Sequence, residues 1–218
     1  MNNEQNLITN DQLGFQHVTC GSTIKLSNQA NQHRLHSHGV SYGSGSGQQS
    51  VTGFSSSDDA NSFWLLRAAF GKQCKRGDPV PCGSIIRLRH TNTNGYLHSH
   101  NHKSPLSSQQ EVSCYDGNDT GDDWRVECAS GSKFWLREEP VQFVHVESQA
   151  YLSCNGAHQF GHPIPGQLEV SGTKGSSKHT QWIAQVNNDN NNNNNNSDAI
   201  MVKYRISLFQ QPFNNTYT

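Results

Sequence analysis

Short segments in which apolar and polar residues alternate recur along the chain, separated by clusters of Gly, Asn, Asp and Ser. Such segments start at Ser22, Ser84 and Val141. Alternation with a period of two places successive side chains on opposite faces of a β-strand, and the residues of the clusters favour turns. We find no convincing amphipathic helix between them. The pattern therefore predicts an all-β protein with little or no helix.

An internal repeat organises these segments. The sequence LHSH at 35–38 returns at 97–100, and a weaker version, LSCN, follows at 152–155. In each copy an alternating run precedes this segment and a Gln-rich run follows it. A tryptophan closes each copy, at Trp64, Trp124 and Trp182, and is interpreted as a core residue. Landmarks kept in one order through three copies predict a domain of three lobes.

Composition sets the expected limits of the folded part. With 218 residues and a hydrophobic content of 32%, the chain can build one compact domain. Residues 1–17 are polar and aperiodic and are expected to be flexible. The repeat occupies 18–186, with copies at about 18–74, 75–130 and 131–186. The segment 187–198 is an asparagine-rich linker that buries too little apolar area to fold, and 199–218 is a tail with a strand-like alternation.

Charge and hydropathy exclude several classes of function. Lys and Arg total 16 against 17 acidic residues, so no basic field attracts nucleic acid. No apolar run is long enough to predict a membrane span. The first residues lack the basic start and apolar core of a secretory signal, and the last four residues are not a KDEL-like retention signal.

The cysteines indicate an oxidising compartment. Cys20 and Cys82 stand at equivalent positions before the first strand of copies one and two, while Cys74 and Cys128 follow the closing tryptophans. If the last strand of a lobe returns beside its first, disulfides would join Cys20 to Cys74 and Cys82 to Cys128. Zinc binding is the alternative, but the chain has no CxxC pair, which favours disulfides.

Three further residues have predicted states. Cys114 and Cys154 have no equivalent partner and are interpreted as free, buried thiols. Asn118 begins an Asn-Asp-Thr sequon and is the candidate for N-glycosylation if the chain enters the secretory pathway.

Histidines of the repeated segment are the candidate chemical groups. An H-x-H pattern on a strand places both imidazoles on one face, as for His36 with His38 and His98 with His100. Their symmetric recurrence argues against catalysis, which normally brings unlike residues to one place. Packing is the first interpretation, a partner surface the second and metal binding the third. We find no catalytic or phosphate-binding motif, so the sequence predicts neither an enzyme nor a cofactor.

A glycine-rich loop follows the first LHSH segment. Ordering several glycines costs conformational entropy, so the loop predicts either a mobile tip or the close approach of a ligand. The candidate partner or glycan surface comprises His36, His38, Tyr42, Gly43, Gly45, His98, His100 and His102.

Several longer segments match one known family. They are RLHSHGVSYGSGSGQQSVTG at 34–53, CGSIIRL at 82–88, DDW at 122–124 and PIPGQLEV at 163–170. Together they resemble the stromal cell-derived factor 2 family of MIR-domain proteins, over about residues 18–185. The resemblance implies a β-trefoil, in which three MIR repeats of about four strands surround a pseudo-threefold axis.

The same resemblance implies a function. It implies a non-catalytic protein of the endoplasmic reticulum lumen, or a secreted one, that takes part in folding quality control and the unfolded protein response. A J-domain co-chaperone and the luminal Hsp70 are the implied partners, and unfolded or O-mannosylated proteins are candidate clients. The alternative is a carbohydrate-binding, lectin-like trefoil module.

Overall fold

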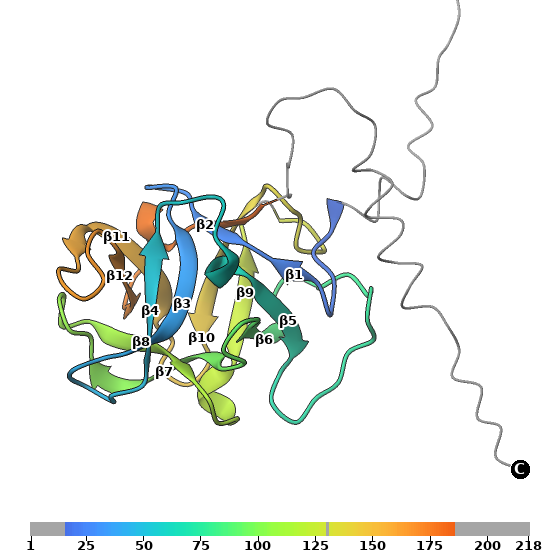
Figure 1. Cartoon of the computed structure of the whole chain (residues 1–218). Helices are drawn as coiled ribbons and strands as arrows, with labels where there is room; N and C mark the ends of the chain where they lie inside the picture. The colour runs from blue at the N-terminus through green and yellow to red at the C-terminus, as the bar shows by residue number, and fades with distance from the viewer. Residues whose placement is uncertain (1–15, 130, 186–218) are drawn as a thin grey trace, which may run out of the picture. The chain divides into compact units, whose positions relative to one another are not determined.

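The structure is a computed structural model that describes residues 16–129 and 131–185. Most of the predicted N-terminal segment, the asparagine-rich linker and the C-terminal tail lie outside the described residues, so those predictions remain untested. Figure 1 shows the chain with its strands labelled.

The described part is built from β-strands. Helical structure in this part is limited to three-residue 3-10 helices, and no helix there is long and apolar enough to cross a membrane. Copy one contains β1 (Thr23–Ile24), β2 (Leu26–Asn28), β3 (Arg34–Ser41), β4 (Gln49–Phe54), η1 (Ala60–Ser62) and β5 (Trp64–Ala68). Copy two contains β6 (Ile85–His90), β7 (Tyr96–Lys103), β8 (Gln110–Tyr115), η2 (Thr120–Asp122) and β9 (Trp124–Cys128). Copy three contains β10 (Pro140–His145), β11 (Tyr151–Gln159), β12 (Leu168–Thr173), η3 (Lys178–Thr180) and β13 (Trp182–Ala184).

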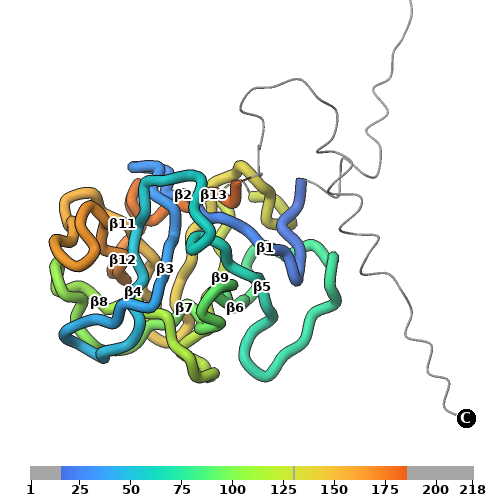
Figure 2. Tube along the Cα trace, in the orientation of Figure 1, coloured from blue at the N-terminus to red at the C-terminus, as the bar shows by residue number. Residues whose placement is uncertain are grey.

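Each copy places its LHSH-like segment in an antiparallel hairpin. The hairpins are β3 with β4, β7 with β8 and β11 with β12, and Figure 2 follows their traces. Their registers are equivalent, because Leu35 pairs with Gly53, Leu97 with Cys114 and Leu152 with Gly172. The sequence repeat is therefore also a repeat of strand pairing.

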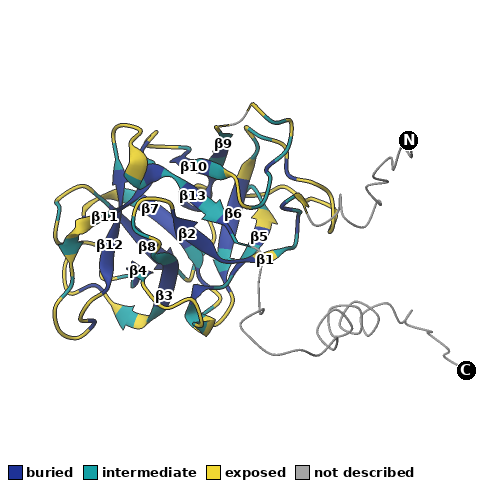
Figure 3. Cartoon of the chain, turned by 90° about the horizontal axis from the view of Figure 1, so that it is seen from above, coloured by how far each residue is buried: buried dark blue, intermediate teal, exposed yellow. Residues whose placement is uncertain are grey.

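The hairpins and the remaining strands belong to one sheet that closes on itself. Strand β9 pairs with both β6 and β10, and β4, β8 and β12 also pair with one another. Figure 3 shows the buried residues concentrated on the strands and the exposed residues on the loops.

The closing tryptophans are wholly buried. In each copy the indole Nε1 donates a hydrogen bond to the carbonyl oxygen of the leucine in the LHSH-like segment. The three bonds join Trp64 to Leu35 at 2.8 Å, Trp124 to Leu97 at 2.9 Å and Trp182 to Leu152 at 2.9 Å. A buried indole needs such an acceptor, so these bonds fix each hairpin against the last strand of its own copy.

Two disulfides link Cys20 to Cys74 and Cys82 to Cys128, the pairs that the sequence repeat predicts. Cys114 and Cys154 are free and buried. Burial raises the pKa of the Cys114 thiol to about 11 and that of Cys154 to about 12. Both thiols are therefore protonated at neutral pH and have the low reactivity of structural cysteines.

Candidate functional site

His36, on β3, is buried beneath the turn that precedes Trp64. Its Nδ1 lies 2.7 Å from Asp59 Oδ2, which also accepts a hydrogen bond from Ser62 Oγ at 2.6 Å. Burial lowers the pKa of His36 more than the nearby carboxylate raises it. Burial acts to raise the pKa of Asp59, but hydrogen bonds from Ser62, His36 and the Asn61 backbone together lower it. A neutral imidazole therefore donates to an ionised carboxylate.

His98 occupies the same position on β7. Its Nδ1 lies 3.0 Å from Asp122 Oδ1 and 3.6 Å from Asp119 Oδ1, a set of ligand types that a divalent cation accepts. Both carboxylates, however, cap η2, since Asp119 accepts from the Gly121 N–H and Asp122 accepts from the Asp119 N–H. These bonds explain the cluster as the cap of a tight turn.

The third copy replaces this pair with neutral groups. Ser153 stands where the others have histidine, and Thr180 stands where copy two has Asp122. Thr180 Oγ1 accepts a hydrogen bond from Gln142 Nε2 at 2.5 Å. The third copy caps the same turn with Ser177 and Thr180, so the turn is common to the copies and does not require a His–Asp pair.

Tyr42, His36 and His98 belong to the candidate partner surface but are buried, which favours packing, the first interpretation of the histidines, over a partner surface at these three positions. Each is less than a tenth exposed. Tyr42 Oη lies 3.0 Å from the carbonyl oxygens of both Val51 and Val112, and burial raises its pKa. Both faces of β3 and β7 are buried near their first residues, so polar side chains are accommodated there where their polar atoms find partners.

The glycine-rich loop is held against the second copy. Ser46 donates from its backbone N–H to Glu111 Oε2 at 3.3 Å and from Oγ to Oε1. His100 Nε2 lies 2.9 Å from the same Oε1, and Glu111 is fully buried. Gly45 has φ +67, and a Cβ on it would overlap Glu111. The glycine at this position therefore allows close packing within the chain, while Gly43 remains exposed at the tip.

His38 and His102 have different surroundings. His38 is half-buried beside the His36 ring, and its Nδ1 accepts from the Val40 N–H at 3.2 Å. His102 is exposed at the end of β7 and borders a groove between copies two and three. Among the predicted histidines, His102 is therefore the best placed to meet another molecule.

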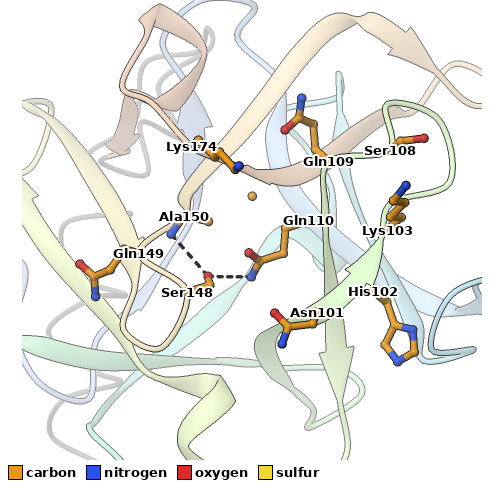
Figure 4. Close-up of a pocket in the computed structure, with 11 residues that line it drawn as sticks. Asn101, His102, Lys103, Ser108, Gln109, Gln110, Ser148, Gln149, Ala150 and Lys174 are labelled. Atoms are coloured by element: carbon orange, nitrogen blue, oxygen red, sulfur yellow. Dashed lines mark hydrogen bonds between the residues drawn. The ribbon is translucent and has the colours of Figure 1, made fainter.

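This groove, named here the copy two–three groove, has a volume of about 520 Å³. It is lined by Asn101, His102, Lys103, Ser108, Gln109, Gln110, Ser148, Gln149, Ala150, Gly172 and Lys174. Figure 4 shows amide and hydroxyl groups from both copies around it, with Lys103 and Lys174 on different walls. Gln110 Nε2 donates to Ser99 Oγ at 2.7 Å and to Ser148 Oγ at 2.8 Å, which joins the two copies.

A smaller groove of about 350 Å³ lies at the equivalent place between copies one and two. Its Gln49 repeats the bonds of Gln110, donating to Ser37 Oγ at 2.7 Å and Thr93 Oγ1 at 2.8 Å. Asp116 lines it where Lys174 lines the other. In the third copy the equivalent glutamine is replaced by Leu168, which is buried near Gly53.

Sequence reasoning missed both grooves. The signal was the Gln-rich run of each copy, which served only as a landmark of the repeat. The grooves form between copies, so a pattern read within one copy does not reveal them.

Asn118 is exposed in the loop before η2, and Arg87 donates a hydrogen bond to its Oδ1. A glycan would attach to the other side-chain atom, Nδ2. N-glycosylation at this position remains a prediction.

Comparison with known proteins gives consistent results. Residues 34–130 match the family model of the MIR domain. The chain is 48% identical over 174 residues to human stromal cell-derived factor 2-like protein 1, covering 78% of this chain and 77% of the relative. The crystal structure of the SDF2-like protein from Arabidopsis thaliana aligns with a TM-score of 0.75 at 41% identity, covering 77% of this chain and 94% of that one.

A larger protein contains a similar module. In the structure of the S. cerevisiae protein O-mannosyltransferase Pmt1-Pmt2 complex bound to the sugar donor, one chain aligns with a TM-score of 0.71 at 27% identity. The alignment covers 90% of this chain and 30% of that one. The shared part is therefore a minor portion of the transferase chain.

Proposed function

The chain belongs to the stromal cell-derived factor 2 family, and we propose that it is a non-catalytic binding subunit of protein-folding complexes in the endoplasmic reticulum lumen. The observation that supports a non-catalytic role is that the buried acid–base groups make structural hydrogen bonds. His36 and His98 bond turn carboxylates, and His100 bonds Glu111. These histidines and carboxylates hold the turns and loops in place, while the grooves between copies are open for binding.

The proposed architecture is a β-trefoil with one MIR repeat in each copy. The equivalent hairpin registers and the three tryptophan-to-leucine bonds support it. In this arrangement the two disulfides connect the start and end of copies one and two. A rigid body of this kind binds through its loops and interlobe grooves at little cost in conformational entropy.

The proposed location is the endoplasmic reticulum lumen. Structural disulfides persist in oxidising compartments, and the relatives named above agree with such a setting. A J-domain co-chaperone and luminal Hsp70 are the proposed partners, with unfolded or O-mannosylated proteins as clients.

Purification of tagged protein from its native cells, after mild cross-linking, tests this proposal. A J-domain protein and Hsp70 should be recovered in amounts comparable to the tagged chain. A version targeted to the cytosol is the control and should recover neither. Recovery of neither partner from the native location would contradict the proposed function.

A second candidate function is glycan binding in the copy two–three groove. Amides and hydroxyls both donate and accept hydrogen bonds, as sugar hydroxyls require, and the groove presents several of each. The similar module in a protein O-mannosyltransferase favours mannose-containing ligands.

A mannose-oligosaccharide and O-mannosyl-peptide array tests the second candidate. Gln110→Leu copies the residue that the third copy has at this position and should reduce binding at least about tenfold. Gln49→Leu makes the same change in the other groove and should leave it unchanged. Equal binding by both variants, or no binding by the unaltered protein, would exclude this site.

A further inference from the structure

A third groove lies where copies one and two join, beside the Cys20–Cys74 disulfide. It has a volume of about 550 Å³ and runs between the strands β5 and β6 and the long loop that joins them. Figure 2 shows this loop standing away from the two strands. The groove shares no lining residue with the two grooves described above.

The surface of this groove is largely apolar. Ile85 is 40% exposed, one of the few large hydrophobic side chains exposed to that extent in the described part of the chain. It is accompanied in the lining by Ala68, Ala69, Pro79, Val80, Pro81 and Ile86. Sugar hydroxyls would find few partners along such a surface, whereas an aliphatic or aromatic side chain would be removed from water there.

The rim of the groove is positively charged. Arg67, Lys72 and Lys75 line it and are exposed, and Asp78 is the acidic residue among the lining side chains. None of these four belongs to an ion pair within the described residues. The local excess of cations contrasts with a chain whose formal net charge is −1. An acidic ligand would gain favourable electrostatic interactions at this rim.

The outer wall is fixed in place. The disulfide holds Cys74, and the Gly77 N–H donates to the Cys20 carbonyl at 2.9 Å. The Cys20 N–H donates in turn to the Asp78 carbonyl, and the Val80 N–H to the Val18 carbonyl. A wall held at several points does not have to be ordered when a ligand binds.

We propose that this groove binds an extended segment of a protein partner, in which an apolar side chain enters beside Ile85 and flanking Asp or Glu residues meet Arg67, Lys72 and Lys75. This inference rests on the proposed function as a protein-binding subunit and names the face it would use. The groove is short, so it suits a peptide of a few residues rather than a broad interface.

Selection of random 12-residue peptides displayed on phage, with the intact disulfide-bonded protein immobilised, tests the proposal. The enriched peptides should carry Asp or Glu around Leu, Ile or Phe. Synthetic copies should lose at least about tenfold in affinity for the double variant Lys72→Glu, Lys75→Glu and for Ile85→Asp. The control Lys174→Glu, Lys178→Glu has the same change in net charge and should retain full affinity.

Three outcomes would overturn the proposal. The first is enrichment of peptides without acidic residues, and the second is equal loss of affinity in the control. The third is a dimer of the unaltered protein in sedimentation that Lys72→Glu, Lys75→Glu abolishes, which would assign the groove to a second copy of this chain. Since Ile85→Asp can alter folding, the charge variants, whose exposed side chains leave the core intact, decide the result.

Purification of the tagged protein with its partners, described above, distinguishes failure of the proposed function from failure of the groove proposal. If Lys72→Glu, Lys75→Glu loses the selected peptides but still recovers the J-domain protein, the groove binds a different partner and the proposed function stands. If the unaltered protein binds acidic peptides but recovers no J-domain protein or Hsp70, the proposed function fails and the groove assignment stands.

Discussion

His98 Nδ1 lies 3.0 Å from Asp122 Oδ1, and the Asp122 side chain is completely buried. Its other oxygen accepts the Asp119 N–H, so the carboxylate connects β7 to the cap of η2. This pair makes His98 a structural residue, and its substitution affects stability before it affects any ligand.

His98→Ala should lower the free energy of unfolding by about 2–3 kcal/mol, because it leaves a buried carboxylate without one of its partners. Urea denaturation followed by tryptophan fluorescence measures the change. His102→Ala, on the exposed end of the same strand, should stay within about 0.5 kcal/mol of the unaltered protein. Equal values for the two variants would show that the buried contact contributes nothing.

Stability should fall as the pH is lowered below about 6.5. Burial lowers the pKa of His90 and His145 beneath the 6.5 of the unfolded chain. The unfolded state therefore binds protons more readily, so stability is complete above pH 6.5 and is lost as the pH falls through the folded-state pKa. Each such histidine contributes at most about 1.4 kcal/mol per pH unit. Denaturation midpoints between about pH 5 and 8 measure the slope.

The first copy supplies a control for this pH dependence. Asn28 stands where the other copies have His90 and His145, and its Nδ2 donates to the His179 carbonyl at 2.7 Å. The double variant His90→Asn, His145→Asn should fold and show a shallower slope. A slope equal to that of the unaltered protein would assign the dependence to other groups, such as His36 and His100, whose pKa values are also lowered by burial.

Substitutions of two glycines in the same loop should distinguish the cost of backbone strain from the cost of side-chain overlap. Gly45 and Gly47 have φ +67 and +70, but a Cβ would meet Glu111 only at Gly45 and nothing within 4 Å at Gly47. Gly47→Ala should cost about 1–2 kcal/mol from the left-handed backbone alone. Gly45→Ala should cost about 1–3 kcal/mol more, because Glu111 must move away from Ser46 and His100. Thermal denaturation compares them, and equal losses would mean that Glu111 adjusts freely.

The Cys82–Cys128 bridge can be tested without touching the grooves. Cys82→Ser, Cys128→Ser should lower the free energy of unfolding by about 2–4 kcal/mol, since the unfolded chain gains conformational freedom. Reduction with dithiothreitol should destabilise the unaltered protein, because it breaks both bridges. In the variant, dithiothreitol can reduce only the Cys20–Cys74 bridge. Peptide mapping without reduction identifies the bridges. An unchanged denaturation midpoint in the variant would contradict a stabilising role.

The sequence alone predicted the strands, the three-copy organisation, both disulfides and the burial of the closing tryptophans. These features follow from local periodicity and from equivalent positions in a repeat, which are visible without knowledge of the fold. It also led to a resemblance that the comparisons confirm at the level of the family.

The tertiary structure decided which candidate residues are accessible. Alternation identifies two faces of a strand but does not say how a buried polar group is satisfied, so His36, His98 and Tyr42 could not be assigned before their partners were known. The partner of Ser46 and His100 is Glu111, which lies in the second copy, far from the glycine loop in the sequence. The grooves likewise form only when separate segments meet, because their walls come from different strands and loops and their shape depends on the distances between them.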